Sequence, residues 1–249
     1  MKKINQKYLF INKTLFFPNE GILVIGDLHI GYEHLYEQSG LQISLGLTSQ
    51  ILDDLKKILN HIKAVYTLKK IVFIGDIKHY FNTQYEEKKE FFKILNLVEK
   101  YVKNPKTDII LIKGNHDTFD LTTKKSKKVH IEDDIAFTHG HRDSLELYDK
   151  KIKYVVMGHI HPSVKISEKK GVKKEIFKCF LEGKYKNKTF IVVPSFFNVT
   201  EGKNVNEFEQ EYHNNFSIIP RRTLLNFKIH AVGELSNFET YDFGEVKDL

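Results

Sequence analysis

Cysteine is almost absent from this sequence. Cys179 is the single one among 249 residues, so an internal disulfide and any Cys-rich zinc site are excluded. Because Cys179 lies in an apolar segment, we expect it to be a small core residue rather than a nucleophile. A chain without disulfides fits a reducing compartment, and we expect a cytoplasmic protein.

Long apolar runs are also missing. No run approaches the roughly 18 residues that a helix needs to span a bilayer. The apolar stretch near the N-terminus is short and is broken by Asn12 and Lys13, which argues against a signal peptide. We therefore expect a protein with no membrane association.

Arginine is scarce for so basic a chain. The formal net charge is +7, yet of 39 basic residues only Arg142, Arg221 and Arg222 are arginine. A basic balance permits a polyanionic partner such as nucleic acid. Lysine is the weaker bidentate phosphate binder, and many lysines lie in loop-like segments such as 122–130 and 168–175. The positive charge therefore has two interpretations, a surface that binds nucleic acid or a set of solvated lysine-rich loops, and the sequence does not decide between them.

The first half of the chain alternates strand and helix signals. Apolar runs predict three buried strands, and between them apolar residues at helical spacing predict two amphipathic helices. Thr48 is a candidate cap for the first helix, and Pro105 follows the end of the second. This order is typical of a parallel sheet covered by helices. The predicted strands are 22–25, 69–75 and 108–114, and the predicted helices are 47–66 and 86–103.

Beyond Gly114 the helix signals mostly stop. Short apolar segments follow, several with period-two alternation, and they predict hairpins and a second, mixed sheet. We expect one domain over residues 1–249, with a β-rich C-terminal part from about residue 164 onward. The predicted strand segments are 134–139, 154–159, 175–182, 188–194 and 223–232.

Polar side chains directly follow five of the predicted strands. Any one pair has a structural interpretation, since a buried Asp can cap a turn and a His can be satisfied in a core. Five such strand ends are harder to explain separately, because a buried polar group without a partner costs about 2–7 kcal/mol, and a shared pair of cations would satisfy all of them. The five clusters are Asp27 and His29; Asp76 and His79; Asn115, His116 and Asp117; His139 and His141; and His159 and His161.

The types of side chain in these clusters suit divalent metals. Imidazole, carboxylate and amide oxygen are ligands for Mn, Fe, Co, Ni or Zn. In an extended chain residues i and i+2 point to the same side, so the 27/29 and 159/161 pairs could each reach one ion. The neighbouring glycines would let the backbone approach ions or substrate closely.

The ordered set D-x-H, G-D, G-N-H-D, T-H-G and G-H-x-H resembles the calcineurin-like metallophosphoesterase superfamily. Within it the chain is most similar to the archaeal SbcD-related (ICC-like) phosphoesterases, with the DNA ligase-associated phosphoesterases as near relatives. "GDLHIGYE" before a helix, "GDIKH" and the segment Pro194–Gly202 support this closer resemblance. The resemblance implies an α/β fold, a four-layer α/β/β/α sandwich with mixed sheets, and a two-metal centre between the sheets.

The resemblance also implies a ligand set and a nucleophile. Two divalent ions, Mn foremost with Fe, Zn, Ni or Co also fitting, would share a hydroxide that attacks phosphorus. Asp76 would bridge both ions. By position, one ion would take Asp27, His29 and His161, and the other would take Asn115, His139 and His159.

Three further residues are candidates for direct roles in catalysis. His116 would stabilise phosphoryl oxygens or protonate the leaving group, and Asp117 would hold its ring. His79 matches the spacing of a substrate-contacting histidine in SbcD-like nucleases, or it could orient a ligand from outside the centre. His141 is expected to contact substrate or a ligand rather than an ion. Structural or surface roles are expected for His34, His61, His130, His213 and His230.

These features predict a metal-dependent phosphoesterase, either a phosphodiesterase or a nuclease. Single-stranded nucleic acid and cyclic nucleotides are the expected substrate classes. The large SbcD-type nucleases continue past the G-H-x-H motif into a DNA-capping domain, whereas the 88 residues that follow His161 predict strands of the second sheet. The sequence has no Walker motif or heptad run, so a self-sufficient recombination nuclease is not expected. The alternatives are a catalytically weak metal-scaffold module that binds other proteins, or a small-molecule phosphatase. The complete ligand set favours catalysis.

Overall fold

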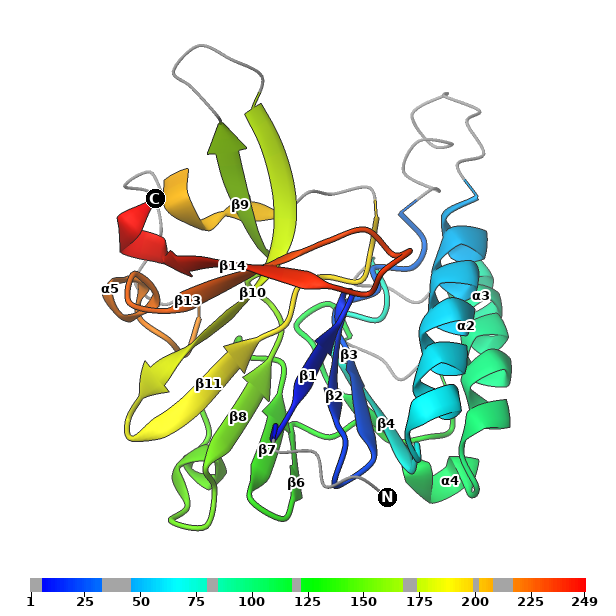
Figure 1. The fold of residues 1–249 in the computed structure, drawn as a ribbon. Helices are drawn as coiled ribbons and strands as arrows, with labels where there is room; N and C mark the ends of the chain where they lie inside the picture. The colour runs from blue at the N-terminus through cyan, green and yellow to red at the C-terminus, as the bar shows by residue number, and fades with distance from the viewer. Residues whose placement is uncertain are drawn as a thin grey trace.

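Two β-sheets form the centre of the computed structural model, which describes residues 6–32, 46–79, 85–117, 122–167, 174–198, 202–207 and 217–249 (Figure 1). The first sheet has the order β1-β2-β3-β4-β5. Its three predicted strands are present and parallel to one another. An antiparallel hairpin at the N-terminal end, which was not predicted, extends this sheet. The bounds are β1 Leu9–Ile11, β2 Thr14–Phe17, β3 Ile22–Ile25, β4 Lys70–Ile74 and β5 Ile109–Ile112.

The second sheet is mixed, as predicted, and has nine strands. Its path runs β12-β9-β10-β11-β8-β7-β6, with β13 and β14 attached through β10. The segment 223–232 was predicted as one strand, but it begins within the short helix α5 (Arg221–Leu224). The bounds are β6 Val129–Glu132, β7 Ile135–Thr138, β8 Tyr154–Met157, β9 Pro162–Ser167, β10 Lys174–Tyr185, β11 Lys188–Val192, β12 Lys203–Asn204, β13 Lys228–Val232 and β14 Thr240–Glu245.

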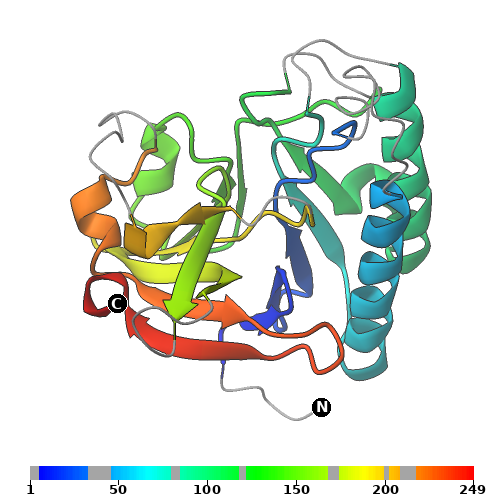
Figure 2. The same cartoon turned by 90° about the horizontal axis from the view of Figure 1, so that it is seen from above.

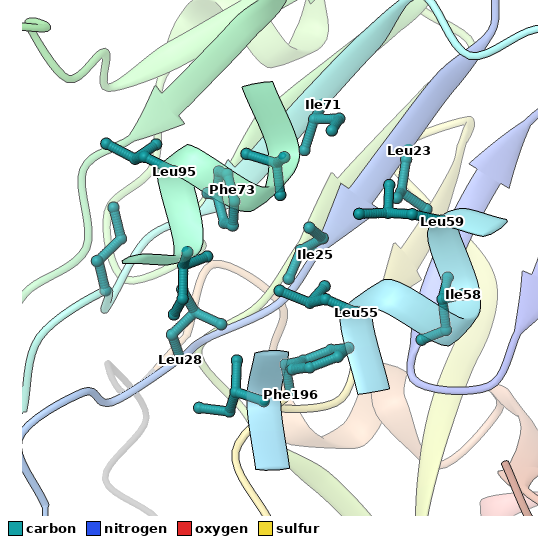
Figure 3. Close-up of a cluster of buried hydrophobic side chains, with 14 of the residues drawn as sticks. Leu23, Ile25, Leu28, Leu55, Ile58, Leu59, Ile71, Phe73, Leu95 and Phe196 are labelled. Atoms are coloured by element: carbon teal, nitrogen blue, oxygen red, sulfur yellow. The ribbon is translucent and has the colours of Figure 1, made fainter. Parts of the chain in front are cut away.

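Two long helices cover the outer face of the first sheet (Figure 2). They are α2 (Leu47–Val65) and α3 (Tyr85–Val98), and their apolar faces pack on β3 and β4 (Figure 3). Leu55 and Leu59 of α2 face Leu23 and Ile25 across this core. Burial of these side chains contributes about 1.5–3 kcal/mol each, which fixes the two strands that lead to the polar loops.

Two details of these helices differ from the predictions, while Pro105 follows the end of the second helix as predicted. Gly46 occupies the N-cap position of α2, and Thr48 lies buried inside the helix. The second helix ends at Val98 and continues only as the 3-10 turn η1 (Glu99–Tyr101). Pro105 begins another short helix, α4 (Pro105–Asp108), because proline lacks the N–H that a first helical position leaves unused.

Three hydrophobic cores separate the layers. One lies under α2 and α3, a second lies between the sheets, and a third lies on the outer face of the second sheet. Buried residues of short helices contribute to the third core, among them Leu147 and Leu224. The fold is therefore an α/β arrangement of two mixed sheets, as predicted, with short helices on the outer face of the second sheet. These helices are η2 (Leu145–Tyr148), η3 (Val205–Glu207), α5 and η4 (Val246–Asp248).

No helix within the described residues is long and apolar enough to cross a membrane. Cys179 is fully buried in β10, as predicted for a core residue. The extent of the domain and the cytoplasmic location stay predictions.

Candidate metal centre

The loops that follow five strands bring the predicted site residues together. Strands β3, β4 and β5 of the first sheet and β7 and β8 of the second all end at this place. All ten predicted metal-ligand and catalytic residues fall within the described part of the chain. Because the two sheets face each other, ligands from both can meet at one end of the central core.

Two groups of possible ligand atoms share Asp76. In each group the ligand atoms lie within 4.8 Å of one another. The first group combines residues from three loops, and the second combines Asp76 with two imidazoles from the second sheet. The groups are Asp27, His29, Asp76 and His161, and Asp76, His139 and His159.

The backbone of these loops is not extended, which corrects the geometric argument from sequence. His29, His159 and His161 have φ values of 46°, 69° and 48°, in the left-handed region. The 159/161 pair is consequently split, with His161 in the first group and His159 in the second. Such backbone costs on the order of 1–3 kcal/mol per residue and persists where surrounding structure enforces it.

Glycines lie against the carboxylates of the site. A side chain at Gly114 would collide with the backbone and the carboxylate of Asp76, and one at Gly158 would lie 2.5 Å from Asp27 Oδ2. Glycine is needed at these two positions because the backbone lies very close to the carboxylates, as the sequence suggested. The neighbours are ligand side chains of the site.

Asp27 is completely buried and is surrounded by imidazoles. His139 Nε2 lies 2.8 Å and His161 Nε2 3.4 Å from Asp27 Oδ1. Burial acts to raise the pKa of Asp27, but His161 and His139 outweigh it and hold that pKa well below its usual range. The carboxylate is therefore ionised and available to a cation.

His139 lies between two carboxylates. Its Nε2 is 2.8 Å from Asp27 Oδ1 and 3.4 Å from Asp76 Oδ2. Burial would lower the pKa of His139, but Asp27 and Asp76 raise it to about 10. At neutral pH a proton on His139 thus neutralises part of the charge that a metal ion would otherwise balance.

The donors fit a divalent metal. The Nε2 atoms of His29 and His161 face each other at 3.2 Å. Burial, followed by the nearby His161, lowers the pKa of His29 to about 3, so its ring is neutral and can act as a ligand. Asn115 Oδ1 is buried and has no hydrogen-bond partner among the described residues. A metal ion would satisfy these nitrogen and oxygen lone pairs together.

We expect metal binding to release a proton. A ligand imidazole must be neutral, and at pH 7 His139 holds a proton because its pKa is raised to about 10. Metal affinity should therefore rise with pH, by about tenfold per unit for each proton displaced. Titration calorimetry in two buffers of different ionisation enthalpy measures this, between about pH 6.5 and 8. Identical apparent enthalpies in both buffers would contradict the assignment of His139.

The residues with predicted roles beside the metals also lie here. The rings of His79 and His116 stack at 5.9 Å between centroids, and His79 is 5.7 Å from the His29 ring. His116 Nδ1 lies 2.7 Å from the backbone oxygen of His79, and this contact orients the ring. Asp117 was expected to hold the His116 ring. Instead, its carboxylate accepts the backbone N–H groups of Gly114 and Ile77 at 2.9 and 3.1 Å. Asp117 thus ties the loop after β5 to the loop after β4.

Some supporting residues were not found from sequence. Ser195 Oγ and the Phe196 N–H both donate to the Asp27 backbone oxygen, at 3.0 and 2.9 Å. Lys178 Nζ donates to Ser195 O at 3.0 Å and also to Phe197 O. Ser195 and Phe196 belong to the segment Pro194–Gly202, which supported the family resemblance. Its sequence alone did not show that it fixes the backbone of Asp27. Residues 199–201 of Pro194–Gly202 lie outside the described residues.

Comparisons with known proteins agree with this geometry. Residues 21–141 match the family model described as calcineurin-like phosphoesterase, and no curated protein matches the chain significantly. Nuclease MPE from Pseudomonas putida has a similar structure, with a TM-score of 0.59 and 17% sequence identity over 94% of both chains. His159 and His161 lie beyond the matched residues.

Two other solved structures show weaker similarity. Protein AQ665 of unknown function from Aquifex aeolicus has a TM-score of 0.35 and 20% identity, covering 56% of this chain and 78% of its own. Wild-type Vps29 from Entamoeba histolytica, complexed with Zn²⁺, has a TM-score of 0.35 and 14% identity, covering 70% and 73%.

The family match and the first of these structures, together with the two ligand groups, lead to one conclusion. The chain has the metallophosphoesterase fold that nuclease MPE also shows, and its residues 21–141 are similar to the calcineurin-like phosphoesterase family.

Proposed function

We propose that this chain is a dinuclear metal-dependent phosphodiesterase that acts on single-stranded nucleic acid or on cyclic nucleotides. The observation that carries the proposal is the pair of ligand groups that share Asp76. A single shared carboxylate is what two adjacent cations require. Two ions would supply Lewis acidity, polarising a phosphoryl oxygen and lowering the pKa of the attacking water.

The side chains of the site divide the remaining tasks. Asp27, His29 and His161 would hold one ion, Asn115, His139 and His159 the other, and Asp76 both. His116 would donate a proton to the leaving oxygen from Nε2, since Nδ1 is held by the His79 carbonyl. His79, whose ring stacks on His116, would contact the substrate from the same side.

A preference for nucleic acid has three supports. They are the SbcD-like motifs, the +7 net charge and the similarity of the fold to a nuclease. A single strand can reach the metal site without unpairing, whereas the bases of a duplex must first be unpaired at a cost of a few kcal/mol. Blunt duplex DNA should therefore be a poor substrate.

The first test is turnover of bis-p-nitrophenyl phosphate by purified protein loaded with Mn. We expect Mn to activate best and Mg weakly, because imidazole ligands disfavour Mg. Absence of turnover with Mn, Co, Ni and Zn, in protein that binds two ions, would support the metal-scaffold alternative.

The second test separates the substrate classes. Labelled single-stranded and duplex oligonucleotides, a 2′,3′-cyclic nucleotide and a small phosphomonoester would be compared at low and physiological salt. Nucleic-acid binding should weaken steeply with salt, since lysines displace counterions from phosphates. Cleavage confined to the phosphomonoester would favour a small-molecule phosphatase.

A further inference from the structure

A cavity of about 360 Å³ opens beside the metal centre, at the edge where the two sheets meet. Asn115 and His141 form the wall toward the centre, and His141 Nδ1 lies 2.9 Å from His139 Nδ1. The volume falls at the lower end of ligand pockets, which span roughly 300–1,000 Å³. A group the size of one nucleotide therefore fits next to a substrate held at the metals.

Three cationic side chains line this cavity: Lys113, Lys128 and Arg142. Within the part of the chain that the structure describes, none of the three forms an ion pair or a side-chain hydrogen bond. Asp117 is the one carboxylate in the described lining, and it accepts the backbone N–H groups of Gly114 and Ile77. Three cations beside one carboxylate leave a net positive potential in the cavity, which favours an anion. Ser144, also in the wall, adds a neutral hydroxyl.

The backbone holds two of these cations in place. Lys113 N–H donates to Lys127 O at 2.8 Å, and Lys127 N–H donates to Leu111 O at 2.8 Å. This bridge joins β5 of the first sheet to the segment before β6 of the second. The positions of Lys113 and Lys128 are therefore set by the contact between the sheets.

The walls favour phosphate over base. Val129 and Thr138 line the cavity from β6 and β7, and among the described residues no Phe, Tyr or Trp lines it. Sequence-tolerant binding of bases depends on stacking against aromatic rings, and the one such ring in the described lining is the imidazole of His141, which lies against His139. An anionic group rather than a nucleobase matches the lining.

We propose that the cavity lined by Lys113, Lys128 and Arg142 is a subsite for a second phosphate of the substrate, one nucleotide away from the scissile phosphate. The inference rests on the proposed function and makes it narrower, since the preferred substrates then carry at least two phosphates. The second phosphate could be an internal phosphodiester of a strand or the terminal phosphate of a small nucleotide.

The test compares substrates that differ only in that phosphate. The thymidine dinucleotide TpT has the scissile phosphate alone, pTpT and TpTp add a terminal phosphate at one end, and TpTpT adds an internal one. We expect kcat/KM to rise by about tenfold or more when the second phosphate is present at the correct end. Preference for TpTpT would indicate strands, and preference for pTpT or TpTp would indicate small nucleotides.

The relevant ratio is kcat/KM for the preferred two-phosphate substrate divided by kcat/KM for TpT. The double variant Lys128→Ala/Arg142→Ala should bring this ratio close to one. The matched control, Lys150→Ala/Lys151→Ala, removes the same charge from exposed positions outside the cavity and should keep the wild-type ratio. Equal cleavage of all four substrates by the wild type, or an unchanged ratio in the cavity variant, would overturn the subsite.

A binding measurement separates this inference from the proposed function. Fluorescence anisotropy of labelled TpTpT and TpT, with EDTA present to prevent hydrolysis, measures binding to the cavity alone. If no substrate is cleaved but the cavity variant binds TpTpT about tenfold more weakly than the control does, the phosphodiesterase proposal fails and the subsite stands. If both variants bind TpTpT as the wild type does, the subsite is wrong.

Discussion

Asp76→Asn is expected to lose metal and activity together. Asp76 is the residue that both ligand groups share, and its carboxylate is ionised: burial acts to raise its pKa, but the contact with His139 outweighs it and lowers the pKa. We expect metal content to fall from two ions per chain to one or none. The rate on bis-p-nitrophenyl phosphate should fall by about 10³-fold or more, because the ions supply several kcal/mol of charge stabilisation.

Asparagine is the sharper substitution at this position. Asp76 has a φ of 37°, a conformation that Asn tolerates and Ala does not. Asp76 Oδ1 accepts the His116 N–H at 2.9 Å, and an amide oxygen can keep that hydrogen bond. Asp76→Asn therefore removes the charge while leaving the loop intact, whereas Asp76→Ala changes both.

Metal analysis by mass spectrometry and thermal melting with and without Mn would measure the result. The wild type should melt at higher temperature with Mn, because a ligand that binds only the native state stabilises it, and the variant should lose that shift. Asp134→Asn, at a surface turn where Asp134 pairs with Lys7, is the matched control. A variant that keeps two ions and full activity would show that Asp76 is not the bridge.

The sequence predicted the parallel strands, and it predicted that the polar residues at their ends come together. The reason is physical. Buried strands such as Ile22–Ile25 and Ile109–Ile112 are continuous apolar runs, and polar residues at their ends are conspicuous against them. Once the strands are parallel, their carboxyl ends must lie at one edge. Bringing Asp27, Asp76 and Asn115 together therefore needs no knowledge of the loops.

The N-terminal hairpin was missed because its turn looks like an interruption. Asn12 and Lys13 break the apolar stretch in the sequence, but they form the connection between β1 and β2, with Asn12 at φ 51°. Lys13 is buried, and its Nζ lies 3.0 Å from Asp54 Oδ2 and contacts Asn198. Partners that distant in the chain are invisible in a local pattern.

The cavity cations were missed for a related reason. Lys128 lies in the lysine-rich segment 122–130, which looked like a solvated loop, and its neighbour Lys127 lies near His130 outside the cavity. Only pairing of this segment with β5 distinguishes Lys128 from the other lysines. Likewise, the sequence does not predict the left-handed backbone of His29, His159 and His161, because the surrounding structure imposes it.

His116→Ala is expected to keep both ions and lose rate, by the 10²–10⁴-fold typical of a general acid. His116 belongs to neither ligand group, and its Nε2 is 3.9 Å from Asp76 Oδ2. The Nδ1–H donates to the His79 carbonyl at 2.7 Å, which leaves Nε2 as the atom that can give a proton to a leaving oxygen.

The leaving group distinguishes proton donation from charge stabilisation. A p-nitrophenolate leaves without a proton, whereas the sugar oxygen of an oligonucleotide needs one. If His116 is the acid, His116→Ala should therefore slow oligonucleotide cleavage far more than hydrolysis of bis-p-nitrophenyl phosphate. Equal losses on both would assign His116 to stabilising the phosphoryl oxygens, and loss of the ions would place it among the ligands. His61→Ala, on helix α2 where His61 stacks on Phe238, is the control that should retain metal and both rates.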